Sequence, residues 1–394
     1  MRSVAIAVLV AVTLTPALLG FAKGRVVGWR RRPSRRARRA RTRPRRGFAE
    51  RWVRAVTRHP IVTTVSVVAV LGTMAIPAAS LTLALPNAGT QPTSSEARQT
   101  YDLTAEYFGP GENGPLILTG TIVTSTDPLG LMDDLADETA DVPGVKEIAL
   151  ATPNETADTG LIQVIPETAP DDPATADLVR ELRSHHDEWL EEYGVDLKVT
   201  GFTAVAIDIS DRLGAALIPF GIFVVGLSLI LLTIVFRSIW VPLKAAAGYL
   251  LSVAASFGAV AAVFEWGWLA DALHVTRTGP VISFMPIILM GVLFGLAMDY
   301  QVFLVSRMRE DYVHAHRAHG GRADRLTAVG AVRTGFVSSA RVVTAAAVIM
   351  FAVFAAFVPE GDSSIKPIAL GLAVGIAVDA FLVRMTLVPA VMAL

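Results

Sequence analysis

The sequence predicts a polytopic α-helical membrane protein that carries an α+β domain outside the membrane. Three observations support this fold class. The chain has 394 residues, of which 53% are hydrophobic, several uncharged runs are long enough to span a membrane, and most acids are gathered in one long polar segment. About 20 apolar residues suffice for a helix to cross a bilayer. The composition therefore excludes a soluble enzyme.

Charge is unevenly distributed along the chain, although the formal net charge is zero. Residues 23–58 hold sixteen Lys or Arg and one acid, Glu50, whereas residues 86–212 hold 25 of the 35 acids against six Lys or Arg. Because cytoplasmic loops are rich in Lys and Arg, we expect the basic segment inside and the acidic segment outside. The Arg- and Pro-rich composition favours a linker on anionic lipid headgroups over nucleic-acid binding.

Seven hydrophobic segments are candidate membrane spans. They lie at 4–22, 61–82, 214–236, 243–264, 282–305, 342–358 and 367–390. The predicted domains are a remnant last helix of an earlier repeat (1–22), a basic cytoplasmic linker (23–59), a transmembrane helix (60–84), an extracytoplasmic domain (85–212) and a five-helix transmembrane domain (213–394) with a cytoplasmic loop (306–341). The absence of cysteine means that no disulfide can stabilise the outer domain.

The first hydrophobic segment resembles the last one. Residues 13–19 read Thr-Leu-Thr-Pro-Ala-Leu-Leu, and residues 386–392 read Thr-Leu-Val-Pro-Ala-Val-Met. Because transporters are often built from repeats, we interpret 1–22 as the end of a preceding repeat whose remainder is missing. A signal peptide is the alternative, but its cleavage would export the most basic stretch, against the charge rule.

The outer domain is predicted to alternate strands and helices. The expected strands are 115–124, 144–150, 161–166 and 195–203, and the expected helices are 128–140 and 172–193. The resulting order, β-α-β-β-α-β, is that of the ferredoxin-like split βαβ motif. Helices cover one face of such a sheet and leave the other free to pack elsewhere.

Two apolar segments each carry an acid, Asp299 and Asp379. An Asp at the bilayer centre costs about 2.5–3.5 kcal/mol on insertion scales, so such residues face the protein interior and usually mark ion or proton paths. A structural acid, held neutral or paired with a base, is the alternative.

Glycines precede both acids at a spacing of four. The two sets are Gly291, Gly295 and Asp299, and Gly371, Gly375 and Asp379. This spacing puts each set on one stripe of a helix, where small residues let helix backbones approach closely. We expect each acid to lie at a tight helix contact.

Residues 295–310 carry a family resemblance. They read Gly-Leu-Ala-Met-Asp-Tyr-Gln-Val-Phe-Leu-Val-Ser-Arg-Met-Arg-Glu, which resembles the signature of the MMPL transporters of the resistance-nodulation-division (RND) superfamily. Residues 97–102 with 108–111, 235–244 and 379–389 are also similar to the family's second half. The resemblance implies a proton-motive-force-driven exporter of lipids or other hydrophobic molecules in the cell membrane. The complete protein would have twelve membrane helices and two porter domains, of which this chain supplies the C-terminal half.

The resemblance also implies residue roles. Asp299 and Tyr300 match the family's proton-relaying Asp-Tyr pair, and Asp379 and Arg384 match an acid and an Arg of the last helix. The supporting residues are Arg307, Phe303, Gly291, Gly295, Gly371 and Gly375. The Asp-Tyr partner of the first repeat would lie upstream of Met1.

Protonation of these acids is expected to change helix packing. An ionised acid recruits Arg384 and tightens the contact, whereas a protonated acid lets it relax, which gives two packings. Asp379 and Arg384 are five residues apart, about 140° around an α-helix, so we expect them to be poor partners for each other. At least one of them should pair across to helix 282–305.

No cofactor, metal or ATP site is predicted. The sequence has no Walker loop, and the spacing of His314, His316 and His319 favours a solvated segment over a metal site. Expected partners are protons, hydrophobic or lipid cargo, membrane lipids, the missing N-terminal repeat and a second copy of the chain as a homo-oligomer, but no nucleic acid. The alternatives are a proton-driven protein-secretion subunit of the same superfamily, a sterol-sensing-like receptor and a truncated, non-transporting product. Tyr300 after Asp299 favours the exporter.

Overall fold

The computed structural model describes residues 47–318 and 325–393, with scattered positions between residues 6 and 21. Side chains at 299, 300, 303, 304, 315–318, 325–328 and 360 lie outside the described set. The chain divides into two units, Met1–Phe48 and Ala49–Leu394. Most of the predicted repeat remnant at 1–22 and all of the linker from 23 to 46 lie outside the described residues.

Five stretches of the described residues are long and apolar enough to cross a membrane. They are Pro60–Ser80, Phe202–Phe236, Trp240–Phe264, Val329–Pro359 and Lys366–Ala393. They coincide with five of the predicted spans. The predicted span 282–305 falls in a helix whose apolar stretch is the shorter Met285–Met298.

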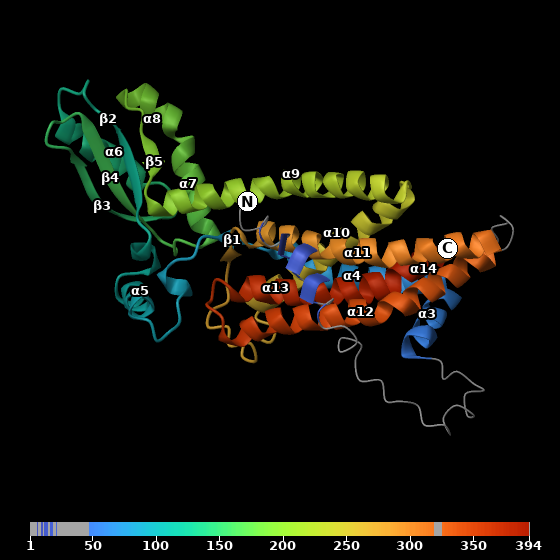
Figure 1. Cartoon of the computed structure of the whole chain (residues 1–394). Helices are drawn as coiled ribbons and strands as arrows, with labels where there is room; N and C mark the ends of the chain where they lie inside the picture. The colour runs from blue at the N-terminus through green and yellow to red at the C-terminus, as the bar shows by residue number, and fades with distance from the viewer. Residues whose placement is uncertain are drawn as a thin grey trace. The chain divides into compact units, whose positions relative to one another are not determined.

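Long helices carry these stretches, and Figure 1 shows α9 to α13 running alongside one another. Their bounds are α4 (Pro60–Ala75), α9 (Phe202–Phe236), α10 (Trp240–Phe264), α11 (Met285–Ala318), α12 (Arg325–Glu360) and α13 (Lys366–Ala377). The 3₁₀ turn η2 (Ile76–Ser80) extends α4, and α13 continues through a π-helical segment, η5 (Val378–Leu387), into α14 (Val388–Ala393). A short helix, α3 (Phe48–Arg58), precedes α4.

Helices extend far into the segment 306–341, which was predicted as a cytoplasmic loop. Helix α11 runs to Ala318 and α12 begins at Arg325. Arg307 Nη1 and Glu310 Oε2, 3.0 Å apart, form an i,i+3 ion pair of the kind that supports a solvated helix. Charged helix formers therefore prolong α11 beyond its apolar part.

The outer domain contains a four-stranded antiparallel sheet. Its elements are β2 (Leu116–Thr121), α6 (Pro128–Ala140), β3 (Val145–Pro153), β4 (Thr159–Pro166), α7 (Pro173–Ser184), α8 (His186–Tyr193) and β5 (Lys198–Thr200). The strands are ordered β3-β4-β2-β5, and Leu118 pairs with both Ile162 and Val199. The single helix predicted at 172–193 is divided into α7 and α8 at His185.

Alternation along the strands builds the core of this domain. Leu116 and Leu118 of β2 are fully buried, whereas the intervening Ile117 is only partly buried, as expected when one sheet face is covered. Trp189 of α8 is also fully buried. Complete burial of one such apolar side chain contributes roughly 1.5–3 kcal/mol.

The turn between β5 and α9 depends on a glycine. Gly201 has φ of 97°, in the left-handed region that a residue with a Cβ rarely adopts. This turn lets α9 begin at Phe202 directly after the sheet. Arg183 of α7 then holds the outer part of α9 through Asp208, with Nη1 and Oδ1 2.7 Å apart.

Short elements connect the outer domain to the membrane helices. These are β1 (Leu83–Ala84), η3 (Ala88–Thr90), α5 (Glu96–Tyr107), η4 (Pro110–Asn113) and β6 (Val281–Ile282). Strands β1 and β6 pair in parallel, which joins the chain leaving α4 to the chain entering α11. Glu265, just after α10, accepts hydrogen bonds from the backbone N–H and hydroxyl of Thr82, at 2.5 and 2.8 Å.

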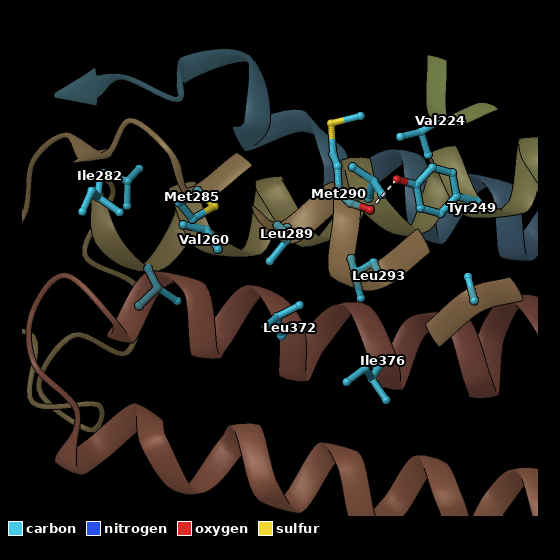
Figure 2. Packing of buried hydrophobic residues seen from close by; sticks show 14 of the residues in the cluster. Val224, Tyr249, Val260, Ile282, Met285, Leu289, Met290, Leu293, Leu372 and Ile376 are labelled. Carbon is cyan, nitrogen blue, oxygen red and sulfur yellow. Dashed lines mark hydrogen bonds between the residues drawn. The ribbon is translucent and has the colours of Figure 1, made fainter. Parts of the chain in front are cut away.

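The membrane core lies where α10, α11 and α13 meet. Figure 2 shows Leu289 and Leu293 of α11 directed toward the helix that carries Leu372 and Ile376. The Tyr249 hydroxyl of α10 donates a 2.8 Å hydrogen bond to the Met290 carbonyl of α11. This bond satisfies a buried hydroxyl inside the apolar core.

Candidate functional site

Asp379 and Arg384 form an ion pair inside the last membrane stretch. Arg384 Nε lies 2.5 Å from Asp379 Oδ2, and the two side chains are 2% and 13% exposed. The prediction that these residues would be poor partners is wrong. It assumed an α-helix, whereas η5 is a π-helix. Hydrogen bonds in a π-helix run from i to i+5, so residues five apart lie on the same face.

The widened turn is visible in neighbouring hydrogen bonds. The Val388 N–H donates to the Val383 carbonyl, and the Thr386 hydroxyl donates to the Phe381 carbonyl at 2.8 Å. Both bonds span five residues. The π-helical turn therefore aligns the acid with the base, and π-bulges are frequent at functional sites.

Arg384 also reaches the neighbouring helix. Its Nη2 donates to the Ala297 carbonyl of α11. The expectation that one member of the pair would bond across to helix 282–305 is thus confirmed, although the acceptor is a carbonyl and not a carboxylate. Arg384 ties the last helix to α11.

Asp299, Tyr300 and Phe303 belong to helix α11. Their side chains lie outside the described residues, so their roles in a relay stay predictions. Arg307, further along α11, is about half exposed and pairs with Glu310. Its supporting role likewise stays a prediction.

The glycines before Asp379 lie at a tight helix contact, as predicted. A Cβ at Gly371 would lie 2.6 Å from Leu289 Cδ1, and a Cβ at Gly375 would lie 2.6 Å from Leu293 Cδ1 and from Ser256 Oγ. Helix α13 therefore approaches α10 and α11 at distances that only glycine permits.

Gly291 and Gly295 of α11 make no such close contact with described residues, and the contact predicted for Asp299 itself stays a prediction. Among the described residues nothing lies within 4 Å of a Cβ at Gly295, and a Cβ at Gly291 would make only an ordinary contact, 3.8 Å from Phe220. Helix α11 is rotated so that Leu289 and Leu293 face α13. Because these leucines enter the glycine grooves of α13, the α11 glycines face elsewhere.

Sequence reasoning missed the small polar residues of α10. Ser252 and Ser256 are buried and donate to the carbonyls of Gly248 and Ser252, at 3.1 and 2.7 Å. Gly248, Ser252 and Ser256 share the four-residue spacing of the glycine sets, which was the signal available. They provide the face that α13 packs on.

A second polar cluster lies outside the membrane. Arg277, between α10 and α11, makes a two-point ion pair with Asp171, which follows β4, at 3.0 and 3.2 Å. The Asp171 side chain is only 7% exposed. Burial, together with the negative charge of Asp171, raises the pKa of the nearby Tyr101 hydroxyl. This cluster connects the outer domain to the membrane helices.

The described helices and the buried ion pair define a polytopic membrane protein with a charged centre between its spans. The chain matches the MMPL family over residues 126–394 and therefore belongs to that family. It is a multi-pass protein of the cell membrane, with residues 85–212 on the extracytoplasmic side.

Similar proteins occur in several bacteria. The chain is 42% identical to Membrane protein YdfJ of Bacillus subtilis, over 100% of this chain and 51% of that protein. It is 30% identical to the Mycolic acid-containing lipids exporter MmpL11 of Mycolicibacterium smegmatis, over 100% of this chain and 40% of that protein. It is 32% identical to the Heme uptake protein MmpL11 of Mycobacterium tuberculosis, over 100% of this chain and 39% of that protein. The chain thus spans about half or less of the length of these relatives.

Proposed function

We propose that the chain is the C-terminal half of a transporter that exports lipids or other hydrophobic molecules and is driven by the proton-motive force. The similarity to a relative named as a lipid exporter supports this cargo class. Another relative is named for heme uptake, so the proposal stops at hydrophobic cargo.

The buried Asp379–Arg384 pair is the observation that carries this proposal. Arg384 cannot lose its charge, whereas Asp379 can accept a proton. Protonation of Asp379 would end the ion pair and leave Arg384 held by Ala297 and its remaining contacts. The contact between the last helix and α11 would then change with each proton, which is the coupling that a proton-driven transporter needs.

Asp299 and Tyr300 are proposed as the second part of the relay. Ala297, which accepts from Arg384, lies within one turn of Asp299 along α11. This proximity along the helix supports a proton path that passes between the two helices. A tyrosine hydroxyl both donates and accepts hydrogen bonds, as a relay requires.

We assign the outer domain, residues 85–212, as a ferredoxin-like porter domain. The strand order β3-β4-β2-β5 with antiparallel neighbours supports this assignment, because a split βαβ motif produces that order. The partly buried sheet face that bears Ile117 would meet cargo or the porter domain of the first repeat. That repeat and a second copy of the chain remain proposed partners.

The test is lipid export in inverted membrane vesicles prepared from the source organism, with Asp379→Asn introduced at the chromosomal locus. Asparagine keeps the shape of the side chain but does not exchange a proton, so export driven by a pH gradient should be lost while the protein level is unchanged. Asp177→Asn, the same change in an exposed pair with Arg180 of the outer domain, is the control. Export at the wild-type rate by vesicles that carry Asp379→Asn would refute the proposal. Loss of protein secretion with intact lipid export would favour the secretion subunit instead.

A further inference from the structure

A cavity opens among the cytoplasmic ends of four membrane helices. It has a volume of about 180 Å³ and is lined by residues of α4, α10, α11 and the end of the last membrane stretch. Its walls are mostly apolar, with Val68, Leu251, Val305 and Val388 among them. An apolar cavity of about 150 Å³ stays dry and binds a benzene-sized molecule. This cavity therefore has room for a short apolar segment and disfavours a chain of waters.

Two polar side chains, Gln301 and Thr64, line the cavity. Gln301 of α11 is 5% exposed, and its amide makes no hydrogen bond to any described residue. The hydroxyl of Thr64 in α4 is buried and also without a partner among the described residues. Buried polar groups are nearly always hydrogen-bonded, so the Thr64 hydroxyl, with the Gln301 amide in the same wall, favours a ligand with polar atoms.

A cation completes the cavity. Lys244 of α10 lines it, is exposed, and donates a 3.2 Å hydrogen bond to the Val391 carbonyl near the end of the last helix. Its remaining ammonium hydrogens can meet an anion at the membrane surface. Basic pockets between helices on the cytoplasmic side suit anionic lipid headgroups.

We propose that this cavity binds an amphiphile with one acyl chain end inside and an anionic, oxygen-rich head at Lys244, drawn from the cytoplasmic leaflet. The Gln301 amide and the Thr64 hydroxyl donate to ester or carboxyl oxygens of the ligand. The apolar walls hold the first carbons of the chain. This site does not depend on the proposed export function, and it is separate from the Asp379–Arg384 pair.

The experiment is native mass spectrometry of the purified full chain in neutral detergent, incubated with phosphatidylglycerol, phosphatidylcholine or oleate. Wild type should retain phosphatidylglycerol or oleate, and the one retained identifies the head as a phosphate or a carboxylate. Lys244→Gln should weaken retention about tenfold, the effect of losing one charge-assisted contact. Arg309→Gln is the matched control, because Arg309 is another exposed cation that donates to a backbone carbonyl at this end, that of Val235.

Two further variants test the interior of the cavity. Val391→Phe, at a half-buried wall position, should fill the space and abolish retention while the circular dichroism spectrum is unchanged. Gln301→Leu should weaken retention yet leave thermal stability equal or higher, because the Gln301 amide makes no hydrogen bond to a described residue that the change would break. A merely structural amide would lose stability on this change.

Four outcomes would overturn the proposal. One is equal retention of phosphatidylcholine, and another is an equal effect of Lys244→Gln and Arg309→Gln. The third is retention that Val391→Phe and Gln301→Leu leave untouched. The absence of any retained amphiphile would do the same, whereas none of these results bears on proton-driven export.

Discussion

Arg384 is the residue on which the membrane site depends. It is 2% exposed, pairs with Asp379 and donates to the Ala297 carbonyl. A charged group inside a bilayer is costly and is kept where it pairs with other groups. These contacts offset the free-energy cost of burying the Arg384 charge, and they also join the last helix to α11.

Loss of Arg384 should destabilise the protein more than loss of the whole pair. Arg384→Gln leaves Asp379 buried without its cation, and breaking a buried pair typically costs about 3–5 kcal/mol. The double variant Asp379→Asn with Arg384→Gln should cost less than Arg384→Gln alone, and therefore clearly less than the sum of the single variants. Thermal unfolding of the purified chain measures this as a double-mutant cycle.

Arg309→Gln is the control for this cycle, because Arg309 is exposed and should change stability by no more than about 0.5 kcal/mol. Additive effects of the two single changes would show that Asp379 and Arg384 are not energetically coupled.

The sequence allowed these residues to be chosen, but not their pairing. An acid and an Arg in an apolar run are visible without a structure, since their cost requires an explanation. The π-helical turn is not visible, because residues 378–387 read like any apolar helix. The turn depends on how the last helix packs on α10 and α11, and the side chains of Asp299 and Tyr300 remain outside the described residues.

At the scale of elements, the fit between α11 and α13 is one-sided. Helix α13 presents grooves at Gly371 and Gly375, and α11 fills them with Leu289 and Leu293. The same arrangement brings Ala297 to Arg384 further along. Close packing at the glycines thus fixes the position along α11, at Ala297, where the ion pair contacts this helix.

Adding one methyl group should distinguish the two glycine stripes. Gly375→Ala forces a Cβ within 2.6 Å of Leu293 and Ser256, and such overpacking typically costs about 1–3 kcal/mol. Gly295→Ala meets no described atom within 4 Å, so it should be neutral or stabilising by up to about 1 kcal/mol, as alanine favours a helix. The measurement is the thermal midpoint of each variant.

Leu293→Ala combined with Gly375→Ala tests the cause, since the smaller side chain frees the space and should restore part of the loss. Equal midpoints for Gly375→Ala and Gly295→Ala would contradict the observed rotation of α11.

Element order followed from the sequence better than helix orientation did. Five apolar runs and the alternating pattern of the outer domain identified spans, strands and helices, because these depend on local composition. Which face of α11 turns inward depends on its neighbouring helices. The four-residue spacing of Gly291 and Gly295 therefore suggested a close helix contact that these two glycines do not make with described residues. The break at His185 within the predicted helix 172–193 was also missed, because no Gly or Pro marks it.

For the whole molecule, the connection between the outer domain and the membrane helices matters most. The β1–β6 pair and the hydrogen bonds of Glu265 hold the chain that enters the outer domain. The Arg277–Asp171 pair links the outer domain itself to the segment between α10 and α11. If α10 and α11 move with protonation in the membrane, this pair transmits the movement outward.

Breaking this link should loosen the junction without unfolding either part. Asp171→Asn keeps the shape of the side chain and removes its charge, which should lower the local opening free energy by about 1–2 kcal/mol, a factor of roughly 5–30 in the opening equilibrium. Hydrogen exchange should therefore quicken at the amides of Gly279 and Val281, which donate to Phe264 and Thr82, while the amides of the four-stranded sheet keep their rates. Asp177→Asn is the control, because Asp177 forms an exposed pair with Arg180 in the same domain and such pairs contribute little. Faster exchange throughout the sheet would mean that Asp171 stabilises the domain itself, and unchanged exchange at Gly279 and Val281 would mean that the pair carries no mechanical link.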